Sequence, residues 1–170
     1  MTHPARRGYT LPLEDELGLH RLTNSSGLEI SVLPNGTVFA IEHVANGERT
    51  MISQVFGSPL GSGIGRVLLR LGSEQRTVEI AGADAAGRIG TAADRFVWAD
   101  ETEGVRHLVT LWLHPEKPIW LWRVELENTG SATIECDAVL IQDLGLGARG
   151  LVLANEAYAC LLYTSPSPRD

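Results

Sequence analysis

The residues whose types and spacing could do chemistry are concentrated in one stretch, from Ile141 to Ala159. Its glycines match the G-x-G-x-x-G pattern of dinucleotide-binding proteins: Gly145, Gly147 and Gly150. That pattern binds a pyrophosphate only where the glycine turn opens a helix, with an acidic residue about 20 positions further on. Here the preceding chain is predicted to be β-structure, and Leu151 to Leu153 is also strand-like. We therefore interpret the glycines as a connection between strands.

No other residues are spaced like a catalytic or metal-binding site. No serine stands in the glycine-flanked pattern of a hydrolase nucleophile. The histidines lie on separate predicted elements and lack the i, i+4 spacing of paired zinc ligands: His3, His20, His43, His107 and His114. Cys136 lies in a strand-like run, so we interpret it as a small buried side chain rather than a nucleophile. We assign no catalytic residue, no metal ligand and no resident cofactor.

The tryptophans permit two interpretations. Trp98, Trp112, Trp120 and Trp122 could form a platform for the apolar faces of sugars. Three of the four alternate with polar neighbours, however, as the core-facing residues of a β-sandwich do. We expect core packing to be their main role.

Composition limits the partners. The formal net charge of −7 argues against nucleic acid and against an anionic membrane, which both need clustered Lys and Arg. A neutral polar ligand fits better. The basic start, Met1 to Arg7, is not followed by the apolar run of a signal peptide, and no window reaches the roughly 20 apolar residues of a membrane span. We expect a cytoplasmic protein with no nucleic-acid or membrane partner.

The elements that position these residues are short strands. Residues 1–26 are expected to form an N-terminal arm. After them, alternating apolar residues predict three strands of an antiparallel meander: Leu28 to Val32, Thr37 to His43 and Thr50 to Val55. The sequences Pro34 to Gly36 and Asn46 to Gly47 supply the two turns between them.

The rest of the chain continues the β pattern. Four further strands are predicted: Arg66 to Leu71, Thr77 to Ile80, Arg95 to Trp98 and Thr133 to Ile141. Ala81 to Ala93 is interpreted as a surface loop, with a helix as the open alternative. The strongest hairpin joins Val105 to His114 with Ile119 to Glu127, because the two prolines between them forbid a continuous helix. We expect an all-β, antiparallel sandwich over residues 27–159.

The end of the chain has an unusual composition. Residues 160–170, Cys160 to Asp170, resemble a translated sequencing adapter rather than a protein segment. We therefore expect a non-native tail there, and a chain that is the front part of a longer protein. A β-sandwich cut partway would be left with uncovered apolar faces and strand edges.

Five segments carry a resemblance to a known family: Thr23 to Leu28, Pro34 to His43, Leu68 to Leu71, Gln142 to Gly145 and Asn155 to Tyr158. Together they resemble the N-terminal β-sandwich of glycoside hydrolase family 94. The similarity is greatest to 1,2-β-oligoglucan phosphorylases and to the phosphorylase-like region of cyclic β-1,2-glucan synthases. It extends over about residues 20 to 159.

The resemblance implies an incomplete, C-terminally truncated β-supersandwich that precedes an (α/α)6 barrel, in an enzyme that cleaves β-glucosidic bonds by inverting phosphorolysis. In that family inorganic phosphate is the co-substrate and the general acid is an aspartate of the barrel, so no catalytic residue falls within this chain. The markers Asp143, Asn155, Glu156 and Tyr158 are the candidate substrate-binding residues. The implied partners are a β-glucan oligosaccharide, the helical catalytic domain and a second copy of the chain.

Three functional hypotheses follow. In the first, the parent is a soluble glycoside phosphorylase acting on β-1,2-glucooligosaccharides, and this chain alone is inactive. In the second, the parent is a membrane-bound cyclic β-1,2-glucan synthase, a transferase. The early Met1 favours the first, because this region lies far from the start of the synthases. The third is a carbohydrate-binding or purely structural sandwich.

Overall fold

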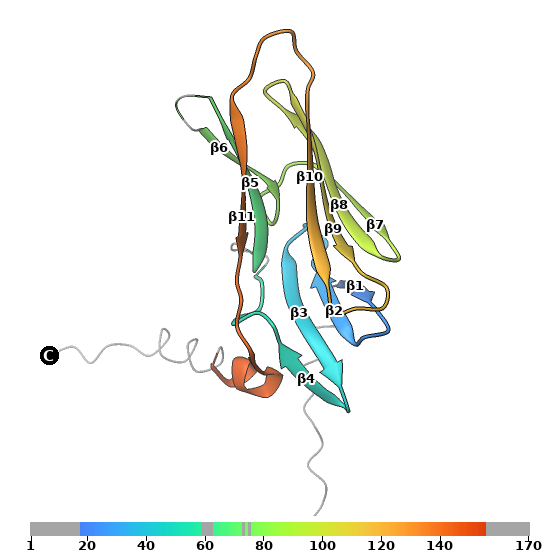
Figure 1. Ribbon diagram of the computed structural model, residues 1–170. Coiled ribbons are helices and arrows are strands. Elements are labelled where there is room, and N and C mark those ends of the chain that lie inside the picture. The colour runs from blue at the N-terminus through green and yellow to red at the C-terminus, as the bar shows by residue number, and fades with distance from the viewer. Residues whose placement is uncertain (1–17, 59–62, 73, 75, 156–170) are drawn as a thin grey trace, which may run out of the picture.

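The computed structural model describes residues 18–58, 63–72, 74 and 76–155 (Figure 1). The strands are β1 His20–Thr23, β2 Leu28–Val32, β3 Val38–Ala45, β4 Glu48–Met51, β5 Gly65–Leu71, β6 Arg76–Ala81, β7 Arg88–Ala92, β8 Arg95–Thr102, β9 Val105–Leu113, β10 Trp120–Asn128, β11 Cys136–Gln142 and β12 Gly147–Ala148. A short helix spans residues 149–155. The predicted all-β, antiparallel class is confirmed. The expected tail, residues 160–170, lies outside the described residues.

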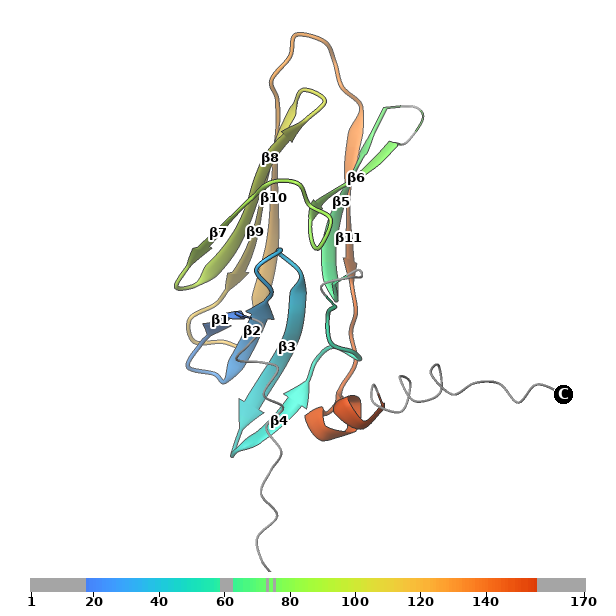
Figure 2. The same ribbon diagram turned by 180° about the vertical axis from the view of Figure 1, so that it is seen from behind.

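The strands form three antiparallel sheets. The N-terminal sheet has the order β1-β2-β3-β4-β12, the four-stranded sheet β10-β9-β8-β7, and the three-stranded sheet β11-β5-β6. In Figures 1 and 2 the three-stranded and four-stranded sheets face each other, and the N-terminal sheet lies at one end of the pair. This is a sandwich-like arrangement, as expected.

One hydrophobic core joins the three sheets. It includes Ile30 of the N-terminal sheet, Leu69 of the three-stranded sheet, and Trp98 and Val109 of the four-stranded sheet, all at most 1% exposed. Burying an indole removes about 200 Å² from water, which contributes roughly 5 kcal/mol before the entropy cost of ordering the side chain. Trp98 is therefore a core residue, as the alternation of residues predicts.

A second, smaller cluster lies on the other face of the N-terminal sheet. Val152 of the helix packs there with Ala40 and Met51. The expectation that Leu151 to Leu153 is strand-like is therefore wrong. A short apolar run does not distinguish a strand from a helix, and here only Val152 is buried, whereas Leu151 is 60% exposed.

Glycine conformations close two of the predicted turns. Asn46 and Gly47 have φ angles of 53° and 80°, as a tight two-residue hairpin turn between β3 and β4 requires. Gly36, with φ at 87°, precedes β3, and a Cβ there would lie 2.6 Å from the indole nitrogen of Trp98. The chain at Gly36 therefore packs directly against the core.

The strand boundaries of the N-terminal region differ from the prediction. The third strand of the meander is β4, Glu48–Met51, and not Thr50 to Val55. Beyond Met51 the chain turns to contact residues 143–145, which the local pattern cannot show. The first strand, β1, lies within the expected arm and pairs with β2. Only Leu22 of β1 is buried, so β1 has no alternating pattern to detect.

Two predictions further along the chain are also wrong. The expected surface loop from Ala81 to Ala93 contains β7, an edge strand. Most of β7 is exposed, so it lacks the apolar alternation of a half-buried strand. Cys136 is a free, exposed residue at the start of β11, not a buried one. It pairs with Leu71, but the inward side of β11 is largely uncovered in the described structure.

Candidate functional site

Gln142 joins two opposing sheets. It ends β11, and its side-chain oxygen accepts hydrogen bonds from the indole nitrogens of Trp120, at 3.2 Å, and Trp122, at 2.9 Å. Trp122 in turn stacks on Trp98, with ring centroids 5.7 Å apart. Trp120 and Trp122 are half-buried and pack against the core. The role of this group is therefore structural: it connects the edge strands β10 and β11.

Asp143 fixes a loop. Its Oδ2 accepts hydrogen bonds from the backbone nitrogens of Gln54, at 2.6 Å, and Val55, at 3.3 Å. Next to it, the backbone nitrogen of Gly145 donates to the carbonyl of Ile52 at 2.6 Å. The carboxylate is thus engaged with the protein's own backbone, at the position where the resemblance suggests a substrate contact.

The other predicted site residues do not form a described site with Asp143. Asn155 is exposed at the end of the helix of residues 149–155. Glu156 and Tyr158 lie outside the described residues. The structure therefore assigns a clear contact to only one of the four candidates, and that contact holds a loop.

The glycine motif has packing roles. A Cβ at Gly145 would lie 2.4 Å from Cγ of Gln54, so the loop approaches closely there. Gly147 belongs to β12, which pairs antiparallel with β4. The helix does follow the motif, so one ground for rejecting a nucleotide site is wrong. The motif nevertheless follows antiparallel β11, whereas the dinucleotide fingerprint belongs to a parallel βαβ unit.

An ionic cluster around the buried Glu42 anchors the helix to the N-terminal sheet. Glu42 is only 3% exposed; its Oε2 lies 3.0 Å from Nη1 of Arg49, and its Oε1 lies 2.8 Å from Nε of Arg149. Arg149 also lies over the ring of Phe56, 5.3 Å from its centroid. Burial raises the pKa of Glu42, and Arg49 opposes that rise. Removing one partner of such a cluster leaves a buried charge uncompensated, so we assign the cluster a structural role.

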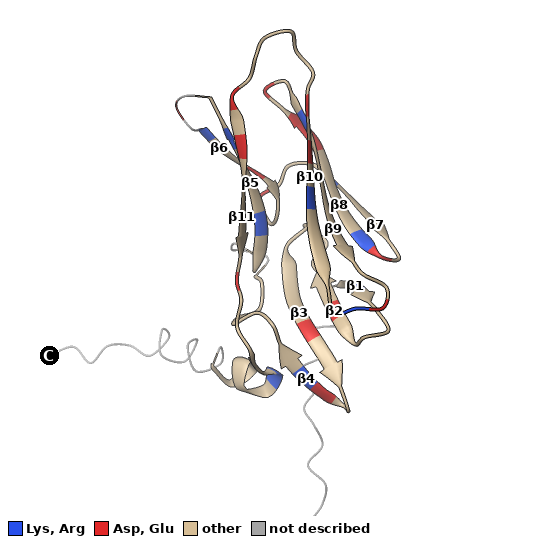
Figure 3. Ribbon diagram, viewed as in Figure 1, with Lys and Arg blue, Asp and Glu red and all other residues tan. Residues whose placement is uncertain are grey.

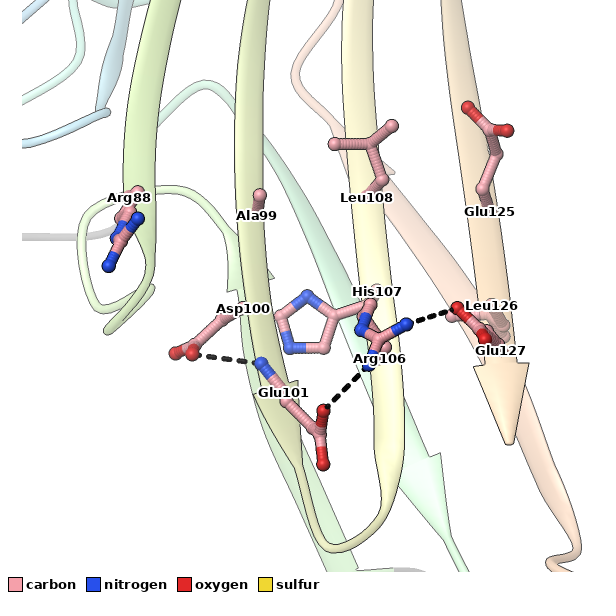
Figure 4. Close-up of a pocket in the computed structure, with 10 residues that line it drawn as sticks. All are labelled: Arg88, Ala99, Asp100, Glu101, Arg106, His107, Leu108, Glu125, Leu126 and Glu127. Carbon is pink, nitrogen blue, oxygen red and sulfur yellow. Dashed lines mark hydrogen bonds and ion pairs between the residues drawn. The ribbon is translucent and has the colours of Figure 1, made fainter. Parts of the chain in front are cut away.

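One hollow lies on the outer face of the four-stranded sheet, the side away from the core. Figure 4 shows its lining residues on β7, β8, β9 and β10, including Arg88, Ala99, Leu108 and Glu125. Its volume is about 760 Å³. A second hollow of about 410 Å³ shares Leu108 and Glu125 with the first and extends to Trp112 and Leu121. Because they share these lining residues, the two hollows adjoin, and we treat them together as one depression.

Strand pairing explains which side chains meet on this outer face. In one row across the sheet, Ala99 pairs with Leu108 and Leu108 with Glu125. In another row, Arg95 pairs with Trp112 and Trp112 with Leu121, and the row of Thr110 lies between the two. Successive residues of β9 alternate between the faces: Leu111 and Leu113 are buried, and Trp112 is half-buried on the outer side. Sequence reasoning grouped Trp112 with the other tryptophans, although its position between buried leucines indicates the opposite face.

Ion pairs border the depression. Arg106 lies 2.7 Å from Glu127 and 3.6 Å from Glu101, as Figure 4 shows. Arg123 lies 3.0 Å from Glu125. Figure 3 shows that residues of both signs occur on the four-stranded sheet.

Asp94 holds Trp112 and Arg95 in place. Its carboxylate accepts hydrogen bonds from the indole nitrogen of Trp112, at 2.9 Å, and from Arg95, at 2.8 Å. The hydrogen bond from Arg95 is the main reason that the pKa of Asp94 lies below its ordinary value. The carboxylate therefore stays charged and keeps orienting the indole ring.

His107 is the buried titratable group beneath this depression. Its Nε2 lies 3.4 Å from the hydroxyl of Thr102, and its Nδ1 is buried without a hydrogen bond. Burial lowers the pKa of His107, and nearby Asp100 partly opposes that effect. The histidine is therefore neutral near pH 7. No group of three or more metal-ligating side chains occurs in the part of the chain that the structure describes.

Comparison with known proteins adds a family. No curated protein matches this chain. Within the described residues, no helix is long and apolar enough to cross a membrane. A family model described as the SOGP N-terminal domain matches residues 31–162, which is most of the chain. The chain belongs to the SOGP N-terminal domain family.

Proposed function

We propose that this chain is the N-terminal, non-catalytic β-sandwich part of an inverting glycoside phosphorylase that acts on β-1,2-glucooligosaccharides. Two findings support the proposal. The family match over residues 31–162 covers nearly the same stretch as the segments that resemble glycoside hydrolase family 94. The description of the family as an N-terminal domain also fits a part that works together with a following domain.

The observation that carries the non-catalytic role is that the family markers make structural contacts. Gln142 bridges two sheets, and Asp143 holds the 54–55 loop. Asn24 also makes a structural contact, with the loop between β9 and β10. Its Nδ2 donates hydrogen bonds to the carbonyls of His114, at 2.6 Å, and Lys117, at 2.8 Å. These residues build the scaffold.

The chemistry would then lie in the helical domain that the resemblance implies. There, an aspartate general acid protonates the leaving oxygen while inorganic phosphate attacks the anomeric carbon. The sandwich contributes a rigid neighbour for that domain. Its loops, such as the one held by Asp143, lie on a fixed scaffold and can border a substrate cleft.

A phosphorolysis assay tests the proposal. The purified chain is incubated with β-1,2-glucooligosaccharides and inorganic phosphate, and glucose 1-phosphate is measured. We expect none. The same assay is then done with the product of the genomic reading frame continued past the codon for Ala159, and there we expect glucose 1-phosphate.

Two results would contradict the proposal. Glucose 1-phosphate released by the chain alone would show that catalysis lies within it. A continued reading frame without a helical domain, or with one that does not use phosphate, would remove the phosphorylase assignment.

A further inference from the structure

We propose that the outer face of the four-stranded sheet binds a neutral glucooligosaccharide, with Trp112 and Leu121 beneath the apolar face of a sugar ring. The proposed function assigns no ligand to this face, so the inference goes beyond it. Only the choice of a β-1,2-linked glucan as the first probe rests on the proposed function.

The apolar part of this surface is already formed. Trp112 lies directly opposite Leu121 in the antiparallel pair of β9 and β10, so their Cβ atoms are about 5 Å apart. Leu121 is 53% exposed and is available to a ligand. The indole ring is held by the hydrogen bond to Asp94 and by an edge contact with His114, with ring centroids 5.5 Å apart. A ring held in this way loses little freedom when a ligand binds.

The charges around the apolar patch favour a neutral ligand. Arginines and carboxylates line the two hollows in equal number: Arg88, Arg95, Arg106 and Arg123 with Asp100, Glu101, Glu125 and Glu127. Most of these form the ion pairs described above. A polyanion would be repelled by the carboxylates, and a polycation would be repelled by the arginines. Sugar hydroxyls can donate hydrogen bonds to the carboxylates and accept hydrogen bonds from the arginines.

The size of the depression favours more than one sugar ring. The hollow beside Trp112 has a volume of about 410 Å³ and shares Leu108 and Glu125 with the neighbouring hollow of about 760 Å³. Small-molecule sites usually measure about 300–1,000 Å³. An oligosaccharide lying along the direction of β9 and β10 would therefore reach both hollows.

A docking protein domain is the competing occupant. The core of a stable protein interface is depleted in charged residues. Here charged pairs lie between the apolar residues: Arg123 stands beside Leu121 on β10, with Glu125 next along the same face. This mixture fits a polar ligand with small apolar faces better than it fits a protein surface.

Binding by the full chain tests the inference. Isothermal titration measures the affinity for short β-1,2-, β-1,3- and β-1,4-linked glucooligosaccharides, for the wild type and for the variants Trp112→Ala, Trp112→Phe and Leu121→Ser. The matched control is Leu140→Ser, because Leu140 is 49% exposed but lies on β11 of another sheet. A urea midpoint for each variant shows that it is folded.

We expect Trp112→Ala to weaken binding by about tenfold or more, Leu121→Ser by about threefold to tenfold, and Leu140→Ser not at all. Trp112→Phe keeps an aromatic face and should retain most of the affinity. Leu121→Ser decides the matter if Trp112→Ala fails to fold, since Leu121 lies outside the core.

Three results would overturn the inference. The first is that the wild type binds no glucan, and the second is that Leu121→Ser binds glucan with the same affinity as the wild type. The third is that Leu121→Ser prevents the chain from binding a helical domain while neither protein binds any sugar. Binding of only β-1,3- or β-1,4-linked glucans would support the site and count against the β-1,2 substrate of the proposed function. Phosphorolysis by the longer protein without glucan binding here would leave the proposed function intact and reject this site.

Discussion

The indole nitrogen of Trp122 donates a hydrogen bond to the side-chain oxygen of Gln142 across 2.9 Å, and the two residues lie on strands of opposing sheets. The ring of Trp122 also lies so close to Gly65 that a Cβ there would approach it to 2.9 Å. Among the residues that the structure describes, both strands are edges of their sheets: β10 pairs only with β9, and β11 only with β5. One side chain therefore links the two sheets at their open side.

Replacing Gln142 tests that link. Gln142→Leu removes the oxygen that accepts hydrogen bonds from Trp120 and Trp122. The indole N–H groups of these two half-buried side chains then lose that hydrogen bond. We expect a loss of about 1–3 kcal/mol in the free energy of unfolding, measured by urea denaturation followed by tryptophan fluorescence. Gln142→Glu keeps the acceptor and should retain most of the stability. Equal stability of Gln142→Leu and wild type would show that the link contributes nothing.

The two roles considered for Asp143 predict different results. As a support for the 54–55 loop, Asp143→Ala should lower the free energy of unfolding by about 1 kcal/mol, because two backbone donors lose their acceptor. Asp143→Asn keeps one side-chain oxygen and should be affected less. In the longer phosphorylase of the proposed function, a large fall in kcat or in substrate affinity with unchanged stability would instead support a direct contact with substrate.

His107 should make stability depend on pH. Its pKa in the folded protein lies below the ordinary value of 6.5, so near that value the folded state binds fewer protons than the unfolded state. The contribution is complete above pH 6.5 and is lost as the pH falls. We expect the urea midpoint to fall between about pH 7.5 and about pH 5.5 more steeply for the wild type than for His107→Gln. Parallel pH profiles would contradict this.

The exposed side of β11 should promote aggregation. Leu140 shares the inward side of β11 with Gln142 but is 49% exposed, and β11 is an edge strand. Lysine on a strand edge opposes pairing between molecules. We therefore expect Leu140→Lys to reduce light scattering at a given protein concentration, whereas Leu151→Lys, which places the same charge on the exposed helix surface, should change it less. Equal effects would assign any gain to net charge alone.

Local patterns predicted the parts of the fold that local physics determines. Prolines and alternation define the hairpin of β9 and β10, and Asn46 with Gly47 defines a tight turn, so both are confirmed. In contrast, β7 and the helix of residues 149–155 exist because of distant partners. β7 pairs with β8 without a buried face of its own, and Val152 is buried because it packs against Ala40 and Met51.

The candidate site was less predictable for the same reason. The sequence shows that Gln142 and Asp143 are polar residues at the end of a strand. It does not show that the donors to Asp143 lie about 90 positions earlier, or that the donors to Gln142 are tryptophans about 20 positions earlier. The position of Trp112 could have been derived, since it alternates with Leu111 and Leu113. The hollow around it depends on the pairing of three strands, β8, β9 and β10, which no local pattern contains.

The pairing of β5 with β11 also determines the order in which the chain can fold. Leu71 pairs with Cys136, about 65 residues later in the chain, whereas the hairpins of β2–β3, β7–β8 and β9–β10 join strands that are neighbours in sequence. During synthesis β5 therefore leaves the ribosome with one edge unpaired. That edge stays unpaired for several seconds until β11 is made, because translation proceeds at about 5–20 residues per second. We expect the local hairpins to form first and the closure of β11 onto β5 to limit the folding rate.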